Sequence, residues 1–310
     1  MPELSLDVKS AADRIAGRVR RTPVLQADPG SFPPAATVSL KLEFLQHTGS
    51  FKPRGSLNAV LAAREAGTLP ETGVVIASGG NAGLAAAWAA AACDSTATVF
   101  LPANAPTFKV DKLRRLGARV ELRGSEYAEA FEAATEFAQR SGALQLHAYD
   151  LPEICAGAGT LGLELLEQVG PLDTVVVAVG GGGLMAGVAT ALRGHARVIG
   201  VEPVGVPTLH SALAAGHPVD VAVDSIAADS LGARRLGGIA HQVAVDCGVR
   251  SLLVEDAAIT EARQLLWDRY RIVVENGAAT ALAALTSGAY TPAPGERLCV
   301  VLCGANTSPI

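Results

Sequence analysis

One short stretch of the chain, TGSFKPRGSLN at residues 48–58, places a lysine where the interior of a helix is excluded. Lys52 stands between Phe51 and Pro53, and a proline does not continue a helix beyond its first turn. Most lysines are solvated surface residues, so this stretch alone favours a loop lysine. Other parts of the sequence must decide whether the amine does chemistry.

A run of four glycines could bind an anion. It joins the apolar segment TVVVAV to a helix-like segment. The free N–H groups and the dipole of a helix N-terminus favour an anion, and glycines let the backbone approach a phosphate closely. Successive glycines carry a large entropic cost, so we interpret Gly180, Gly181, Gly182 and Gly183 as an anion site rather than a structural turn.

A second glycine turn, ASGGNAG at residues 77–83, has a more polar character. Ser78 and Asn81 bring hydroxyl and amide groups to the start of a helix, which suits a carboxylate or a phenolate oxygen as well as a phosphate. Helix capping by serine or asparagine explains these residues equally well, so this turn alone stays open.

A dinucleotide site is an alternative interpretation of the four-glycine run. Gly181, Gly183 and Ala186 satisfy the spacing G-x-G-x-x-A. Glu202 ends the next apolar segment, close to where an acid would bind a ribose. A nicotinamide-dependent oxidoreductase and a non-catalytic ligand-binding protein are therefore both open at this point, although neither explains the SFKPRG stretch.

The elements that must position these residues alternate between strands and helices. The pattern predicts strands at 38–45, 74–77, 96–101, 119–122, 174–179, 197–201 and 298–302, and helices at 53–66, 81–93, 108–116, 126–140, 152–169, 184–192, 209–215, 260–270 and 278–285. Such alternation is typical of parallel sheets covered by helices on both faces. The two glycine turns lie about 100 residues apart, which indicates one turn in each of two domains.

Length and composition limit the class of protein. The 310 residues suffice for two domains or one large one, and 49% of them are apolar. A formal net charge of −5 without a charged tail gives no sign of a nucleic-acid or membrane partner, and no apolar run approaches the ~20 residues of a membrane span. Five cysteines without C-x-x-C spacing, and an N-terminus unlike a signal peptide, predict a reduced, cytoplasmic protein.

Together, these stretches resemble the fold-type II pyridoxal-phosphate enzymes, and among them the short serine/threonine dehydratases. The segments LKLEFLQHTGSFKPRGSLNA, SGGNAG and GGGGLMAG are similar to the family's cofactor-lysine segment, its substrate and cofactor loop, and its phosphate cradle. AADRIAGRVRRTPVL is similar to its N-terminal segment, and IVVENGAATALAAL and VVLCGAN to its C-terminal ones. Their order and spacing match over nearly the whole chain.

The resemblance implies a role for each candidate residue. Lys52 would be the catalytic lysine, which forms a Schiff base with pyridoxal 5′-phosphate. Phe51 would pack against the cofactor ring, Asn81 would bind its phenolic oxygen and Cys303 would face its pyridine nitrogen. The groups implied for the two anionic parts are the amides of Ser78, Gly79, Gly80 and Asn81 for the substrate carboxylate, and Gly180, Gly181, Gly182, Gly183 and the Leu184 amide for the cofactor phosphate.

The resemblance further implies an ammonia-lyase that acts on L-serine and L-threonine. The substrate would lose its β-hydroxyl as water, and the products would be a 2-oxo acid and ammonia. A thiol at Cys303 cannot keep the pyridine nitrogen protonated, which favours prompt elimination over a long-lived carbanion. Another β-hydroxy amino acid as the substrate, or a β-replacement reaction, is the alternative within the family.

Four positions depart from the family's patterns. Ala82 replaces the histidine that many threonine dehydratases have after the asparagine, so NAG is more similar to the short serine-dehydratase branch. Gly79 replaces a serine of the racemases, so the resemblance implies no racemisation. Asn276 follows Glu275 where the family usually has proline, and the sequence offers no interpretation of this change. Glu202 fits a cation ligand of the family, but Thr208 replaces an aspartate of the divalent-binding members, which leaves a monovalent cation as the expectation.

The resulting prediction is an α/β protein of the tryptophan-synthase-β-like fold, with two domains whose twisted, parallel-type sheets are flanked by helices. Residues 43–146 form the small domain with Lys52 and Asn81, and residues 1–42 with 147–310 form the large domain with the glycine run. We expect a cytoplasmic homodimer that binds a small amino acid and serves amino-acid catabolism.

Overall fold

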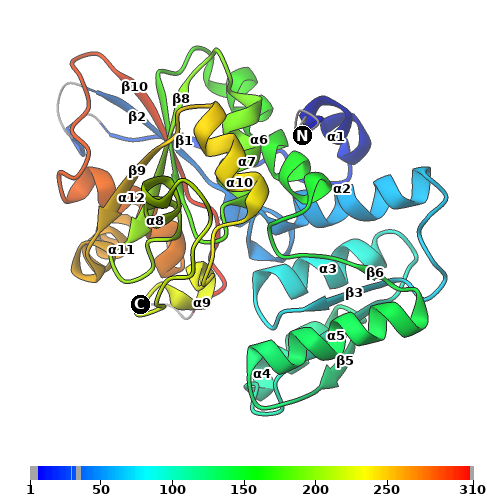
Figure 1. The fold of residues 1–310 in the computed structure, drawn as a ribbon. Helices are drawn as coiled ribbons and strands as arrows, with labels where there is room; N and C mark the ends of the chain where they lie inside the picture. Colours follow the sequence, from blue (N-terminus) through cyan, green and yellow to red (C-terminus); the bar gives the residue numbers. More distant parts are fainter. Residues whose placement is uncertain (1–5, 29, 33–35, 308–310) are drawn as a thin grey trace.

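Two separate β-sheets organise the chain (Figure 1), which the computed structural model describes over residues 6–28, 30–32 and 36–307. The larger sheet has six strands in the order β1-β2-β10-β7-β8-β9, in which β1 and β2 pair antiparallel and the other neighbours pair parallel. Its strands are β1 (Val24–Gln26), β2 (Thr37–Lys41), β7 (Thr174–Ala178), β8 (Arg197–Pro203), β9 (Arg250–Val254) and β10 (Arg297–Val301).

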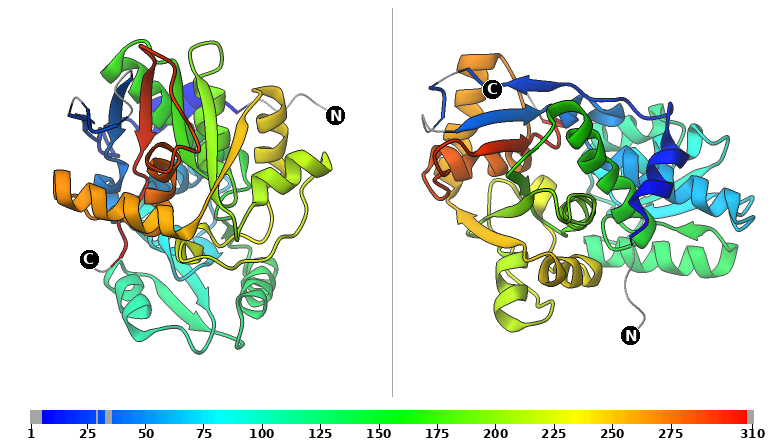
Figure 2. Two further views of the ribbon diagram at one scale, coloured as in Figure 1. Left: turned by 90° about the vertical axis from the view of Figure 1, so that its left-hand side faces the viewer. Right: turned by 90° about the horizontal axis from the view of Figure 1, so that it is seen from above.

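The smaller sheet has four parallel strands in the order β5-β4-β3-β6. Every residue of β3 and β4 is buried, because helices cover both faces, as is usual for parallel strands. Figure 2 shows this cyan-to-green part of the chain grouped on one side of the molecule. It consists of β3 (Val74–Ala77), α3 (Asn81–Ala91), β4 (Ala97–Leu101), α4 (Thr107–Arg115), β5 (Arg119–Leu122), α5 (Tyr127–Ser141) and β6 (Leu144–Gln145).

Helices also cover both faces of the larger sheet. Figure 1 shows α6, α7 and α10 on one face and α11 and α12 on the other. The bounds of these helices are α6 (Pro152–Val169), α7 (Gly183–Ala191), α10 (Gly238–Asp246), α11 (Asp256–Tyr270) and α12 (Asn276–Thr286). The remaining helices are α1 (Val8–Ile15), α2 (Lys52–Glu65), α8 (Thr208–Ala215) and α9 (Ala228–Leu231), with short 3-10 turns at Glu43–Leu45 and His47–Gly49. Among the helices described, none is long and apolar enough to cross a membrane.

Helices α2, α6 and α7 pack with their backbones in direct contact because glycines line their interfaces. A Cβ atom added to Gly157 of α6 would lie 2.4 Å from the carbonyl oxygen of Arg54 in α2. One added to Gly187 of α7 would lie 2.1 Å from the carbonyl oxygen of Cys155 in α6. Side chains do not fit at such distances, so glycine is required where these three helices meet.

The predicted fold class is confirmed, and most predicted elements form within a few residues of their expected bounds. The strand predicted at 38–45 is wrong in its second half: β2 ends at Lys41, and a 3-10 turn follows. Glu43, in that turn, points inward and pairs with Arg54, which replaces the continuing strand by a tertiary contact. The domain boundaries at residues 43 and 146 stay a prediction.

Candidate active site

One cavity of about 50 Å³ brings together the residues that the sequence assigns to a cofactor. The glycine run contributes from the end of β7, Asn81 from the start of α3 and Lys52 from the start of α2. The side chains and backbone that line the cavity belong to Phe51, Lys52, Asn81, Tyr149, Ala178, Gly180, Gly181, Gly182, Gly183, Leu184, Ser230, Leu231, Glu275 and Cys303.

Lys52 is the first helical residue of α2, which begins one residue before the helix predicted at 53–66. Its half-buried amine donates a hydrogen bond to the Ala148 carbonyl oxygen at 2.6 Å and lies 4.8 Å from the centre of the Phe51 ring. Burial lowers the pKa of Lys52 to about 8, although the nearby Cys303, Cys155 and Glu275 act in the opposite direction. A sizeable fraction of the amine is therefore neutral near physiological pH.

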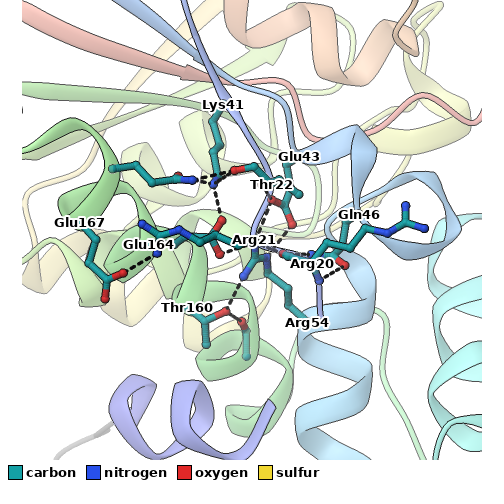
Figure 3. Close-up of polar contacts among 12 residues, drawn as sticks. Arg20, Arg21, Thr22, Lys41, Glu43, Gln46, Arg54, Thr160, Glu164 and Glu167 are labelled. Atoms are coloured by element: carbon teal, nitrogen blue, oxygen red, sulfur yellow. Dashed lines mark hydrogen bonds and ion pairs between the residues drawn. The ribbon is translucent and has the colours of Figure 1, made fainter. Parts of the chain in front are cut away.

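A buried charge network anchors the first turn of α2 (Figure 3). Arg54 donates through Nε to Glu43 Oε1 at 2.6 Å and through Nη2 to Glu164 Oε2 at 2.8 Å. Lys41 Nζ donates to the other oxygen of Glu164 at 2.5 Å. Two cations thus balance two carboxylates, and the side chains of Arg54 and Glu43 are 1% and 0% exposed. Because Arg54 stands two residues after Lys52, the network fixes where the lysine begins its helix.

The four-glycine run forms the turn between β7 and α7, and Gly183 is the first helical residue. Gly182 has a φ of +89°, a left-handed conformation in which a side chain is strained. A Cβ atom at Gly181 would lie 2.2 Å from the Tyr149 ring. The turn therefore presents only its backbone to the cavity, directly before a helix N-terminus, as the close approach of a phosphate requires.

Asn81 is held by two partners that the sequence did not predict. Its Nδ2 atom donates to Glu275 Oε1 at 2.9 Å and Oε2 at 3.1 Å, and its Oδ1 atom accepts a hydrogen bond from Asn306 Nδ2 at 2.7 Å. Burial raises the pKa of Glu275, against the hydrogen bonds from Asn81 and the Asn306 amide. These contacts fix the direction of the Asn81 amide, whose role toward a cofactor ring stays a prediction.

Cys303 follows β10 and lines the cavity, and 5% of it is exposed. Burial raises the pKa of its thiol far above the usual range, and the negative Glu275 adds to this effect. The thiol is therefore neutral. Its backbone carbonyl oxygen accepts a hydrogen bond from the Phe51 amide at 3.0 Å, which ties β10 to the residue before Lys52.

The loop expected to bind a substrate carboxylate, Ser78 to Gly80, joins β3 to α3. It leads directly to Asn81, although its own residues are not among those that line the cavity. The Ser78 hydroxyl accepts a hydrogen bond from the Gly80 amide at 3.3 Å. A Cβ atom at Gly79 would lie 2.6 Å from the Leu101 side chain, so a serine there would require Leu101 to move.

The Glu202 side chain lies inside the protein, close to the glycine run rather than in the cavity. Its carboxylate is 0% exposed and accepts hydrogen bonds from the Leu209 amide at 2.6 Å, the His210 amide at 2.9 Å, and the hydroxyls of Thr208 and Ser251. Burial raises its pKa, and these hydrogen bonds oppose the rise. A carboxylate engaged in this way is not free to bind a ribose. Over the described residues, no group of three or more His, Cys, Asp or Glu side chains is placed to hold a metal ion.

Sequence reasoning missed three polar residues of the cavity. Glu275 stood in a recognised segment, IVVENGAATALAAL, but no role was assigned to it. Tyr149 follows the end of β6, and the ends of parallel strands are where sites form. Its hydroxyl donates to the Arg235 carbonyl oxygen at 3.2 Å. Ser230 comes from α9, a helix of four residues without a local sequence signal.

Comparisons with known proteins agree with this geometry. Residues 15–304 match a family model described as pyridoxal-phosphate dependent enzyme. An L-threonine ammonia-lyase of Geobacter sulfurreducens is 37% identical over 303 residues, which are 96% of this chain and 74% of that protein. A phenylserine dehydratase of Ralstonia pickettii is 34% identical over 310 residues, which are 99% of this chain and 94% of that protein. Among solved structures, the processed form of threonine deaminase isoform 2 from Solanum lycopersicum matches with a TM-score of 0.88 at 28% identity, and the match covers 97% of this chain and 83% of that chain.

Proposed function

Because the chain belongs to the pyridoxal-phosphate-dependent enzymes, we propose that it is an ammonia-lyase that acts on L-serine and L-threonine. It would eliminate the β-hydroxyl as water and release an enamine, which takes up water again and hydrolyses to a 2-oxo acid and ammonia. The observation that supports this most directly is one cavity that holds a lysine with a pKa of about 8, a side-chain-free glycine turn and a neutral thiol. The family and the cofactor predicted from the sequence are confirmed.

The residues of the cavity fit the parts of pyridoxal phosphate. Backbone amides of Gly180 to Gly183 and of Leu184 would hold the phosphate at the start of α7. The Lys52 amine would hold the aldehyde carbon, with Phe51 against one face of the ring and Asn81 near its phenolic oxygen. Once bound, the cofactor supplies the electron withdrawal that makes the Cα–H bond of the substrate acidic.

The chain's own groups would then move the protons. Neutral Lys52 would accept the Cα proton, since its lowered pKa increases the fraction of the amine that is unprotonated. The Ala148 carbonyl oxygen, 2.6 Å from the amine, orients it. Cys303 would not protonate the pyridine nitrogen, because burial raises the pKa of its thiol and the thiol therefore keeps its proton. This weakens the electron withdrawal and favours prompt loss of the β-hydroxyl.

The loop before α3 bears on which enantiomer of the substrate the proposed enzyme accepts. The amides of Ser78 to Asn81 would hold the substrate carboxylate at a helix N-terminus. Gly79 offers no side chain that could donate a proton from the face opposite Lys52. We therefore include in the proposal that the enzyme acts on L-amino acids and does not racemise them.

A monovalent cation, a homodimer and a cytoplasmic location complete the proposal. Support for the cation is the fully buried Glu202 carboxylate, whose donors among the described residues are all neutral. Support for the cytoplasm is that all five cysteines are free, as thiols are in a reducing compartment. The homodimer is a prediction from the sequence alone, and light scattering tests it.

The test is a coupled assay for 2-oxo acid with L-serine, L-threonine and their D-isomers. We expect turnover of the L-isomers and a visible absorbance band from lysine-bound pyridoxal phosphate. Lys52→Ala should remove both, while the control Lys112→Ala, an exposed lysine of α4, should keep both. Activity confined to a D-isomer, or product formed only when an external nucleophile is added, would refute the dehydratase assignment.

A further inference from the structure

The short helix α9 lies where the two sheets approach one another (Figure 1) and touches the active site through glycines. A Cβ atom at Gly180 would lie 2.9 Å from Leu231 Cα, and one at Gly277 would lie 2.2 Å from Ser230 Oγ. On the other side, Asp229 of α9 pairs with Lys109 of α4 at 2.6 Å. Helix α9 is therefore held close to the four-glycine run, to the start of α12 and to the smaller sheet.

Ser230 is the polar side chain that α9 contributes to the cavity. The other polar side chains there already have partners: Lys52 donates to Ala148, Asn81 to Glu275, and Tyr149 to Arg235. Within the described part of the chain, no hydrogen bond joins Ser230 Oγ to another group. A hydroxyl that lines the cavity without a protein partner is free to bind a ligand, as donor or as acceptor.

The turn that precedes α9 is fixed by side chains from α11 and α12. Asn276, the first residue of α12, donates through Nδ2 to the Ile226 carbonyl oxygen at 2.8 Å and accepts from Arg263 Nη1 at 3.0 Å. Asp256 accepts from the Ser225 hydroxyl at 2.6 Å and from the Ile226 amide at 2.9 Å. Asn276 directly follows Glu275, which lines the cavity. Its side chain thus connects the start of α12 to the segment that carries Ser230.

We propose that the Ser230 hydroxyl contacts the amino-acid substrate and that Asn276 is the positioning residue that holds α9, and with it Ser230, at the cavity. This inference rests on the proposed function and deepens it. It also gives a reason for an asparagine at the first position of α12. Proline suits such a position equally well, but its side chain cannot hold the turn at Ile226.

Asn276→Pro is a selective test because it removes the side-chain amide and retains the helix start. Proline is favoured at the first helical position, where the missing N–H has no partner inside the helix. Glu275 has φ −70° and ψ 158°, which is the extended conformation that a following proline prefers. We therefore expect Asn276→Pro to fold and to retain the visible absorbance of bound pyridoxal phosphate.

Steady-state kinetics should separate KM from kcat. Ser230→Ala should raise KM for L-serine and L-threonine about threefold to tenfold, as loss of one hydrogen bond does, with kcat nearly unchanged. Asn276→Pro should raise KM similarly, and the double variant should be no worse than Ser230→Ala alone, since Asn276 acts through Ser230. Unchanged KM in either single variant, or additive effects in the double variant, would overturn the inference.

Asn276→Asp distinguishes the two hydrogen bonds of this side chain. Aspartate keeps an acceptor for Arg263 but cannot donate to the Ile226 carbonyl oxygen, so it should behave like Asn276→Pro. Wild-type kinetics in Asn276→Asp would overturn the assigned route through Ile226. Asn104→Ala, in an exposed loop, is the matched control and should leave KM unchanged.

Hydrogen exchange tests the positioning without reference to turnover. Amides of residues 225–231 should exchange faster in Asn276→Pro than in wild type and at the wild-type rate in Ser230→Ala. If wild type turned over no β-hydroxy amino acid, the proposed function would fail while this measurement still tested the hold of Asn276 on α9. Equal exchange in Asn276→Pro and wild type would refute the positioning role.

Discussion

Replacing Arg54 by methionine should destabilise the protein severely, because it removes one charge from a buried, neutral set. Lys41 and Arg54 balance Glu43 and Glu164, and the side chains of Arg54 and Glu43 are 1% and 0% exposed. After Arg54→Met, Glu43 keeps the Thr22 hydroxyl as its side-chain hydrogen-bond donor, at 2.6 Å. Breaking a buried pair from one side costs about 3–5 kcal/mol.

That loss is a large part of the total stability of a typical domain, about 5–15 kcal/mol. Urea unfolding followed by tryptophan fluorescence gives the change in free energy of unfolding. Arg123→Met is the control, since the pair of Arg123 with Glu121 is largely exposed and worth at most about 1 kcal/mol. The double variant Arg54→Met/Glu43→Gln restores neutrality and should recover part of the loss.

Arg54→Lys refines the reasoning, because it keeps the charge and loses the forked geometry. A lysine cannot reach Glu43 and Glu164 in the bidentate manner of a guanidinium, so an intermediate loss is expected. If Arg54→Met cost no more than Arg123→Met, or if the double variant were less stable than Arg54→Met, the account of a charge-balanced buried set would be refuted.

Three further predictions concern the cofactor and the cation. Burial lowers the pKa of Lys52 to about 8, and the amine is neutral above its pKa. Apoenzyme should therefore combine with pyridoxal phosphate about tenfold faster per pH unit up to about pH 8 and level off above it; a flat stopped-flow profile from about pH 6 to 8 contradicts this. Gly181→Ala would place a Cβ atom 2.2 Å from the Tyr149 ring and should weaken pyridoxal phosphate binding about tenfold in equilibrium dialysis; unchanged affinity contradicts the tight fit of the turn. Potassium should raise the thermal midpoint above that in tetramethylammonium salt, and Glu202→Gln should remove the difference; equal midpoints for wild type in both salts contradict a cation at Glu202.

Local sequence patterns predicted those elements whose ends carry their own signals. Helix α6 spans residues 152–169 as predicted, because Pro152 begins it and Gly170, at φ +76°, follows its last turn. Elements without such signals were missed. Strand β9 is half-buried along most of its length and lacks a fully apolar run, and α9 has four residues.

The sequence indicated several residues that line the cavity, but it did not indicate the contacts among them. Lys52, Asn81 and Cys303 line one cavity together with the glycine run. The pairing of Glu275 with Asn81 joins positions 194 residues apart, which no local pattern encodes. The second half of the strand predicted at 38–45 does not form for a related reason: the apolar residues of LEFL suit a strand, but the tertiary pairing of Glu43 with Arg54 turns the chain.

The glycine contacts among α2, α6 and α7 have a mechanical consequence. Helix α2 begins with Lys52 and α7 begins at the four-glycine run, and both touch α6 backbone to backbone at Gly157 and Gly187. Contacts of this kind have no side chain that could slide or yield, so the three helices move as one piece. A displacement of the smaller sheet would therefore move Asn81 and the loop before α3, while Lys52 and the four-glycine run would keep their positions relative to one another. If Lys52 and the four-glycine run hold pyridoxal phosphate as proposed, such a displacement would open the substrate side of the cavity and leave both cofactor contacts in place.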